Sequence, residues 1–236
     1  MTAIRGILFD KDGTLFNFQE SWAGWAEDML EELAAGDVDL GDAMADAIGF
    51  DTAERGFRPS SPAIAGTPDE VADLLMPYLD GRFLRSSLIA RLVESTIDAP
   101  MAPAAPLAPL LDRLADMGLV LGVATNDAEE PARAHLAAAG ILDRFAFIAG
   151  HDSGFGAKPQ PGQCAAFARA TKMAPDDCVM VGDSRHDLLA GRGARFRTIG
   201  VLTGLAVRAD LAPLADAVLP SIADLPGWLQ GEAAGR

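Results

Sequence analysis

The chain of 236 residues is half hydrophobic and 22% charged, a composition that favours a folded protein with a sizeable core over wholesale disorder. Its 34 acidic residues against 19 basic ones give a formal net charge of −15, which argues against nucleic acid and anionic membrane surfaces as partners. An anionic substrate would need a local positive site in this field, and a bound divalent cation could supply one.

The first residues and the cysteines bear on the compartment. The apolar run before Asp10 is too short for a signal peptide or a membrane span. Cys164 and Cys178 have no paired spacing, so we expect both to be small core residues in a reducing compartment. The expected location is therefore the cytoplasm.

The first elements along the chain are a strand and then a helical block. Residues 4–9 predict a short buried strand, whereas residues 16–98 show helical spacing and no clear strand. One apolar helix face in this block consists of Trp22, Trp25, Met29 and Leu33. Further helices are expected over 42–48, from Thr67 onward with Pro68 in the first turn, and over 83–96.

A Pro/Ala-rich segment, 98–109, is the clearest boundary, and beyond it helices and strands alternate. The expected strands are 119–124, 145–148, 178–181 and 197–201, and the expected helices are 107–117, 131–139, 162–172 and 187–192. Such alternation is typical of a parallel sheet covered on both faces. The predicted fold is therefore α/β, a Rossmann-like doubly wound parallel sheet core with an inserted all-α helical cap. The expected core is 1–15 and 100–236, and the expected cap is 16–99.

Polar residues follow four of the predicted strands, at the edge where ligands bind in open α/β sheets. They are Asp10 and Asp12 after the first strand, Thr125 and Asn126 after the second, Lys158 in the loop after the third, and Asp183 and Asp187 after the fourth. Carboxylate oxygens at such a cleft suit Mg²⁺. A cation there would keep Asp10 ionised and able to attack as a nucleophile, while Asp12 could act as an acid and then a base. Thr125 and Lys158 could bind phosphoryl oxygens.

These motifs, DKDGTL, TN after a strand, a lone KP and GDSRHD, resemble the four ordered motifs of the haloacid dehalogenase superfamily of phosphohydrolases. The resemblance covers the whole chain, including a helical cap of the C1 type inserted after the first motif, and the layout looks most like phosphoglycolate phosphatases. It implies that Asp10 forms an aspartyl-phosphate and that Asp12 is the general acid/base. It also implies that Thr125, Asn126 and Lys158 bind phosphate.

The resemblance further implies a metal site. Mg²⁺ would be ligated by Asp10, Asp183 and the backbone carbonyl of Asp12, with Asp187 supporting the metal waters or Lys158. The implied enzyme is a Mg²⁺-dependent phosphoric monoester hydrolase of a small phosphorylated metabolite, and 2-phosphoglycolate is the first substrate to consider.

Two alternatives stay open. A sugar phosphomutase shares the core, although its cap normally uses basic residues, including lysine, and residues 16–98 contain no lysine. A non-catalytic binding protein on this core is the other, and it predicts the loss of Asp10, Asp12, Lys158 or Asp183, all of which are present. The pathway and the choice between monomer and dimer are left open as well.

For several further residues the sequence predicts only a general role. Lys11 lies between the two acids on the alternate side, where we expect a structural or solvated role, and we expect His135 on a helix surface. His186 is expected to face solvent or pack locally. The cap residues that contact substrate are left open among Arg55, Arg58, Arg82, Arg85, Trp22 and Trp25.

Overall fold

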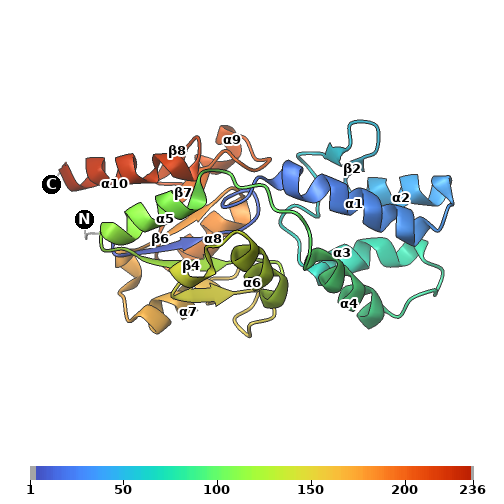
Figure 1. The fold of residues 1–236 in the computed structure, drawn as a ribbon, viewed down its shortest axis with the longest axis horizontal. Coiled ribbons are helices and arrows are strands. Elements are labelled where there is room, and N and C mark those ends of the chain that lie inside the picture. Colours follow the sequence, from blue (N-terminus) through green and yellow to red (C-terminus); the bar gives the residue numbers. More distant parts are fainter. Residues whose placement is uncertain (1–3, 235–236) are drawn as a thin grey trace.

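The structure, a computed structural model, describes residues 4–234 and contains a six-stranded parallel sheet with strand order β5-β4-β1-β6-β7-β8 (Figure 1). The strands are β1 (Gly6–Phe9), β4 (Val120–Ala124), β5 (Phe147–Ala149), β6 (Cys178–Gly182), β7 (Arg197–Val201) and β8 (Ala217–Leu219). The central strand β1 pairs with β4 on one side and with β6 on the other. The ends of β4 and β6 therefore lie directly beside the acids that follow β1.

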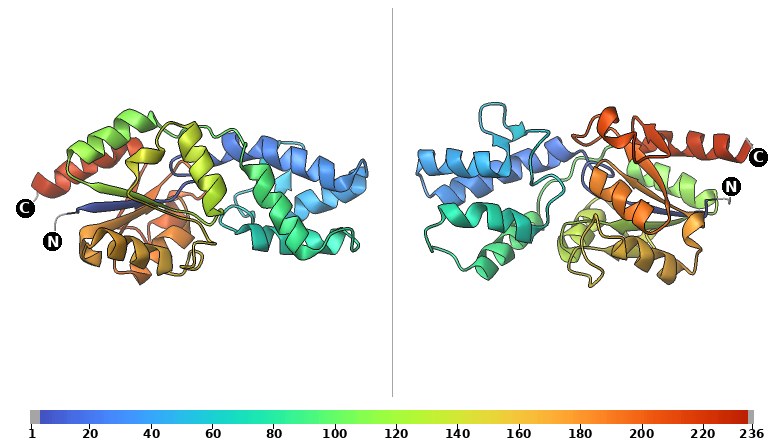
Figure 2. Two further views of the ribbon diagram at one scale, coloured as in Figure 1. Left: turned by 60° about the horizontal axis from the view of Figure 1, so that its bottom comes forward. Right: turned by 180° about the vertical axis from the view of Figure 1, so that it is seen from behind.

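Helices cover both faces of this sheet (Figure 2). One face packs against α5 (Leu107–Asp116), α6 (Glu129–Ala138) and α10 (Leu225–Ala234), and the other against α7 (Gly162–Thr171) and α8 (Arg185–Gly193). Successive β1 residues alternate between the two cores, with Ile7 and Phe9 on the first face and Leu8 on the second. This alternation follows from the two-residue period of a strand, and burial on both faces explains why the strand is apolar throughout.

The chain between β1 and β4 forms a helical insertion at the end of the sheet where the acids lie, seen at the right of Figure 1. Its helices are α1 (Phe18–Ala34), α2 (Val38–Ile48), α3 (Pro68–Leu75) and α4 (Arg85–Thr96). They share a hydrophobic core of their own, separate from the two cores of the sheet. The insertion therefore has its own source of stability.

Side-chain caps define where these helices begin. Asn17 caps α1 and Asp37 caps α2, each accepting a hydrogen bond from a backbone N–H of the first turn. At α3, Thr67 and Glu70 form a capping box around a first turn that starts with Pro68. The expected helix start at Thr67 is thus confirmed.

The remaining elements are short. They are β2 (Phe50–Asp51), β3 (Gly56–Phe57), η1 (Met76–Tyr78), η2 (Leu142–Arg144), η3 (Pro175–Asp177), α9 (Arg208–Leu211) and η4 (Ile222–Asp224). The antiparallel pair β2–β3 contradicts the expectation of no strand in residues 16–98, although the insertion is otherwise helical. Two-residue strands leave no periodic signal in a sequence, which is why they were missed.

The predicted α/β fold with a parallel sheet and a helical insertion is confirmed. The structure adds the edge strand β8 and the helix α10, and it starts α2 four residues earlier than expected, at Val38 rather than 42. Cys164 and Cys178 are both buried and free, as expected. Within residues 4–234, no helix is both long and apolar enough to cross a membrane.

The capping box at α3 gives a test of how the insertion is stabilised. Thr67→Ala removes both side-chain hydrogen bonds of Thr67, and we expect it to lower the free energy of unfolding by about 1 kcal/mol in urea titrations. Thr67→Ser keeps the hydroxyl and should stay near wild type. Equal stability of the alanine variant and the wild type would show that the box contributes nothing.

Candidate active site

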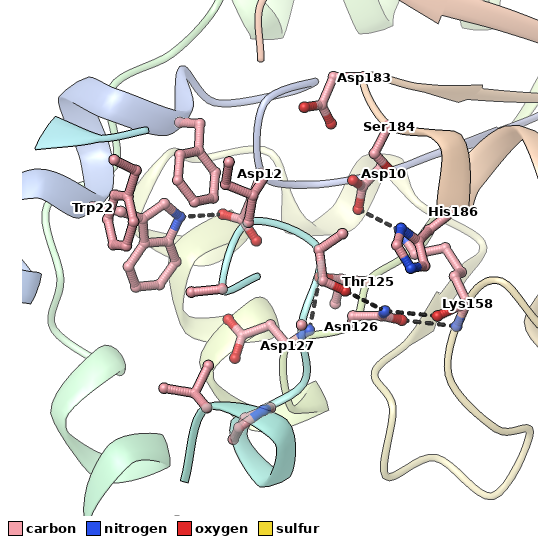
Figure 3. A pocket seen from close by; sticks show the side chains of 18 of the residues that line it. Asp10, Asp12, Trp22, Thr125, Asn126, Asp127, Lys158, Asp183, Ser184 and His186 are labelled. Atoms are coloured by element: carbon pink, nitrogen blue, oxygen red, sulfur yellow. Dashed lines mark hydrogen bonds and ion pairs between the residues drawn. The ribbon is translucent and has the colours of Figure 1, made fainter. Parts of the chain in front are cut away.

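The carboxyl ends of β1, β4 and β6 open into a pocket between the sheet and the helical insertion (Figure 3). The hollow has an empty volume of about 800 Å³, including open solvent at its mouth. The sequence-predicted site residues all line it; they are Asp10, Asp12, Thr125, Asn126, Lys158, Asp183 and Asp187. Residues up to 177 positions apart in the chain thus meet at one edge of the sheet, as the parallel topology requires.

Three buried carboxylates form the floor of the pocket. Asp10, Asp183 and Asp187 each offer an oxygen, and these oxygens lie within 4.8 Å of one another. Burial, together with the negative charge of Asp187, raises the pKa of Asp10 to about 7. The same causes, burial first, raise the pKa of Asp183 well above its ordinary value. Ionised carboxylates held this close are unfavourable without a compensating cation.

The donor set fits a hard divalent cation. It consists of oxygen atoms from carboxylates, which is the chemistry that Mg²⁺ prefers, and its excess negative charge is what a cation would neutralise. The backbone is shaped closely around Asp183, because a Cβ added at Gly13 or at Gly204 would collide with its carboxylate. Gly13 also has a φ of +76°, which favours glycine. Gly13 belongs to the sequence motif DKDGTL, whereas Gly204 lies outside all four motifs and was missed.

Lys158 is the cation that touches the acid cluster. Its Nζ donates to Asp10 Oδ1 at 2.6 Å and to the carbonyl oxygen of Ala124 at 2.8 Å, and it lies 2.7 Å from Asp187 Oδ1. Burial alone would lower the pKa of Lys158, but Asp10 and Asp187 outweigh it and raise that pKa above its ordinary value. The ammonium therefore stays charged and holds two of the three acids in place.

Asp12 points a different way from Asp10 and lies under the first helix of the insertion (Figure 3). Its Oδ1 accepts one hydrogen bond from Lys11 Nζ at 2.9 Å and another from Trp22 Nε1 at 2.8 Å. Both bonds fall on the same oxygen, so the carboxylate is oriented while Oδ2 remains for other chemistry. Trp22 belongs to α1, so the insertion itself positions this acid.

Lys11 is fully buried, which contradicts the solvated alternative considered for it. Its Nζ lies 3.2 Å from Asp127 Oδ2 and 5.1 Å from the centre of the Trp22 ring, in addition to its bond with Asp12. Burial alone would lower the pKa of Lys11, but the two carboxylates outweigh it and raise the pKa above its ordinary value. The lysine between the two acids of the first motif is therefore the counter-ion of Asp12 and Asp127.

His135 is buried rather than on the surface of α6 as expected. Its Nε2 lies 2.6 Å from the carbonyl oxygen of Thr96 at the end of α4, and its Nδ1 lies 3.1 Å from Lys11 Nζ. A carbonyl only accepts, so Nε2 carries the proton and Nδ1 accepts from the lysine. Burial and the charge of Lys11 lower the pKa of His135, in keeping with this neutral form. The histidine joins the core to the insertion.

The Asn126 side chain connects loops instead of pointing its amide at the pocket floor. Its Nδ2 donates to the carbonyl oxygens of Ala65 and Lys158, at 2.8 and 2.9 Å, and its Oδ1 accepts from the Lys158 backbone N–H. This leaves the backbone of Asn126, together with the Thr125 hydroxyl, for contact with a ligand. The amide also fixes the loop that carries Lys158.

The cap residues left open by the sequence divide into two groups. Trp22 and Trp25 line the pocket, together with His186 from the core, whereas none of the cap arginines belongs to its described lining. The rings of Trp22 and Trp25 meet edge to face, with centroids 5.4 Å apart. His186 therefore faces the site, which its position inside the fourth motif could have indicated.

This fold, acid cluster and lysine define a class of hydrolase, and the family comparison agrees. Residues 4–195 match the haloacid dehalogenase-like hydrolase family, so the chain belongs to that family and is an enzyme, a hydrolase of its phosphatase type.

Curated relatives and a solved structure extend over most of the chain. A phosphoglycolate phosphatase from Xylella fastidiosa (strain 9a5c) is 30% identical over 85% of this chain and 81% of its own length. Another, from Nitrosospira multiformis, is 28% identical over 96% of each chain. The crystal structure of CbbY from Rhodobacter sphaeroides in complex with phosphate superposes with a TM-score of 0.67, at 24% identity over 94% of this chain and 96% of that one. This last similarity shows the shared fold.

The buried position of Lys11 gives a prediction for stability. Lys11→Met would leave Asp12 and Asp127 without their counter-ion, and we expect it to lower the free energy of unfolding by about 3–5 kcal/mol in urea titrations. Adding Asp127→Asn should restore part of the loss, because it removes one unpaired carboxylate.

Lys172→Met is the matched control, since Lys172 is exposed, and its effect should stay within about 0.5 kcal/mol. If Lys11→Met and Lys172→Met had the same small effect, the counter-ion role of Lys11 would be wrong.

Proposed function

We propose that this protein is a Mg²⁺-dependent phosphatase that hydrolyses a small phosphate monoester through an aspartyl-phosphate on Asp10. The observation that carries the proposal is the pairing of a buried three-carboxylate cluster with Lys158, beside a second acid, Asp12, that is oriented by one of its two oxygens. In-line transfer of a phosphoryl group needs mainly positioning and charge neutralisation, which this arrangement supplies.

In the first step an oxygen of Asp10 attacks phosphorus, and the bond between phosphorus and the leaving alcohol oxygen breaks. Asp10 Oδ1 accepts hydrogen bonds from Lys158 Nζ and from the Lys11 backbone N–H, so we assign the attack to Oδ2. Asp12 Oδ2 gives its proton to the leaving oxygen as that oxygen gains charge.

In the second step Asp12, now ionised, takes a proton from a water molecule, and the water oxygen attacks phosphorus. The phosphorus–oxygen bond to Asp10 breaks, which releases inorganic phosphate and regenerates the carboxylate. Thr125 Oγ1, the Asn126 backbone N–H and Lys158 are proposed to bind the phosphoryl oxygens. The Lys11 and Trp22 bonds hold Asp12 in place through both steps.

Asp10, Asp183 and the Asp12 carbonyl would hold Mg²⁺, with Asp187 in support. When bound, the ion neutralises negative charge on the phosphoryl group and on the acids.

We propose 1–15 and 100–236 as the catalytic core and 16–99 as the cap, and a cytoplasmic location. Closure of the cap over the substrate would exclude bulk water.

The names of the curated relatives make 2-phosphoglycolate the first substrate to test. No observation favours the phosphomutase alternative, because the described pocket lining contains no basic cap residue for a second phosphate. A non-catalytic protein is disfavoured since Asp10, Asp12, Lys158 and Asp183 all meet in the pocket.

The proposed chemistry predicts hydrolysis of p-nitrophenyl phosphate that depends on Mg²⁺. Asp10→Asn keeps the size of the side chain but removes the nucleophile, so kcat should fall by at least about a thousandfold. Asp12→Asn should lower kcat by about 10²–10⁴-fold. Full activity of Asp10→Asn, or full activity in excess chelator, would contradict the proposal.

The raised pKa of Asp10 predicts how Mg²⁺ binding depends on pH. Protons compete with the ion for a carboxyl whose pKa in the metal-free enzyme is about 7. The group is mostly protonated at pH 6 and mostly ionised at pH 8, so the Mg²⁺ Kd should be about tenfold weaker at pH 6. The Asp183 shift acts in the same direction.

Melting temperatures measured across a Mg²⁺ titration at the two pH values check this. Asp183→Asn is the control and should largely abolish the Mg²⁺-dependent rise. A Kd that is the same at pH 6 and pH 8 would show that Asp10 does not take part in binding the ion.

A further inference from the structure

The wall of the pocket that faces the acids is apolar and partly aromatic. It is built by the helical insertion, and its principal members are Phe18, Trp22, Trp25, Phe57, Ile64 and Val71. This wall is where the alcohol portion of a phosphate ester would lie, because the phosphoryl group is held opposite it, by the strand ends. The chemistry of the wall therefore selects the alcohol.

The cationic side chains of the insertion do not belong to the described lining of the pocket. Residues 16–99 contain five arginines and neither lysine nor histidine. Four of these arginines pair with acids of the insertion itself: Arg55 with Glu27, Arg58 with Asp46, Arg85 with Asp69 and Asp73, and Arg91 with Glu32. The fifth, Arg82, is exposed, and its Nε donates to the carbonyl oxygen of Leu79. None of the five is in the described lining of the pocket.

The polar side-chain groups that the insertion contributes to this wall already have partners. Trp22 Nε1 donates to Asp12 and Trp25 Nε1 donates to Ser95 Oγ at 2.9 Å. The Thr96 hydroxyl donates to the carbonyl oxygen of Val93 at 2.7 Å. Asp127, a further acid, lines the same pocket. A carboxylate placed against this wall would thus lose its hydration to apolar side chains, and no cation of the insertion lines the described pocket to replace it.

From this contrast we propose that the substrate is a phosphate monoester of an uncharged, largely apolar and preferably aromatic alcohol, and that the natural substrate is not 2-phosphoglycolate. The inference rests on the proposed phosphatase function and narrows it. Trp22 and Trp25, whose own rings meet edge to face, give this wall a surface on which an aromatic ring of the substrate would pack.

The test is a comparison of kcat/KM for benzyl phosphate, 4-carboxybenzyl phosphate and 2-phosphoglycolate, with saturating Mg²⁺. The first two esters have the same benzylic leaving oxygen and differ by one carboxylate, so their ratio isolates the charge. We expect benzyl phosphate to be favoured over each of the other two by at least about tenfold.

Equal or higher kcat/KM for either carboxylated ester would overturn the inference and leave the phosphatase intact. Failure to hydrolyse any of the three esters, and p-nitrophenyl phosphate as well, would overturn the phosphatase proposal and the inference with it. The two failures are therefore distinguishable.

An arginine variant tests the same inference by adding positive charge to the wall. Ile64 lies half-buried in the loop before α3, so Ile64→Arg adds a guanidinium to the wall and replaces none of the acids or lysines. It should raise kcat/KM for 2-phosphoglycolate and lower it for benzyl phosphate, each by about tenfold. Ile64→Gln is the uncharged control and should not raise activity on 2-phosphoglycolate. A glutamine variant that gained as much as the arginine variant would contradict a role for charge.

Discussion

The site is organised by an excess of buried negative charge at the carboxyl ends of parallel strands. Asp10, Asp183 and Asp187 converge where β1 and β6 end, and Lys158 is the ammonium that touches them. Burial and mutual repulsion raise the pKa values of Asp10 and Asp183, so the arrangement is poised to take up either protons or a cation. The glycines that crowd Asp183 are consistent with a floor that is shaped around this cluster.

A second buried cluster lies beside the first and serves a different purpose. Lys11 balances Asp12 and Asp127, while Trp22 and His135 tie the same group to the insertion. The acid proposed to move protons is therefore oriented partly by α1, which belongs to the insertion proposed to cover the substrate. This links the position of the insertion to the geometry of Asp12, since displacing α1 would remove one of the two hydrogen bonds to Asp12 Oδ1.

The insertion contrasts with the core in chemistry. The core supplies charged groups to the pocket, whereas the insertion supplies mainly apolar and aromatic ones and keeps four of its five arginines in ion pairs of its own. The charged groups of the core are those of the proposed reaction, whereas the proposed choice of alcohol depends on the insertion. The chain can therefore resemble phosphoglycolate phosphatases although its insertion brings no cationic side chain to the described pocket lining.

Local patterns predicted most of the core because strand period and strand-end position are local properties. The acids after β1 and β6 were found in this way. The burial of Lys11 could not be predicted, because its partners Asp127 and His135 lie more than 100 residues away in the chain. A strand pattern states only that the Lys11 side chain faces opposite to those of its neighbours. Gly204 and the short β8 were missed for a similar reason: each is defined by contact with another strand or loop, and neither has a periodic signal.

The central claim is that Asp10 becomes phosphorylated during turnover, and trapping that intermediate tests it most directly. The enzyme would be quenched in acid during steady-state hydrolysis of p-nitrophenyl phosphate with Mg²⁺, reduced with borohydride, and digested for peptide mass spectrometry. An acyl phosphate is reduced to an alcohol, so the account predicts homoserine at position 10 and unmodified aspartate at position 12. Homoserine at another position, or Asp10 unmodified in an enzyme whose burst kinetics show an accumulating intermediate, would contradict it.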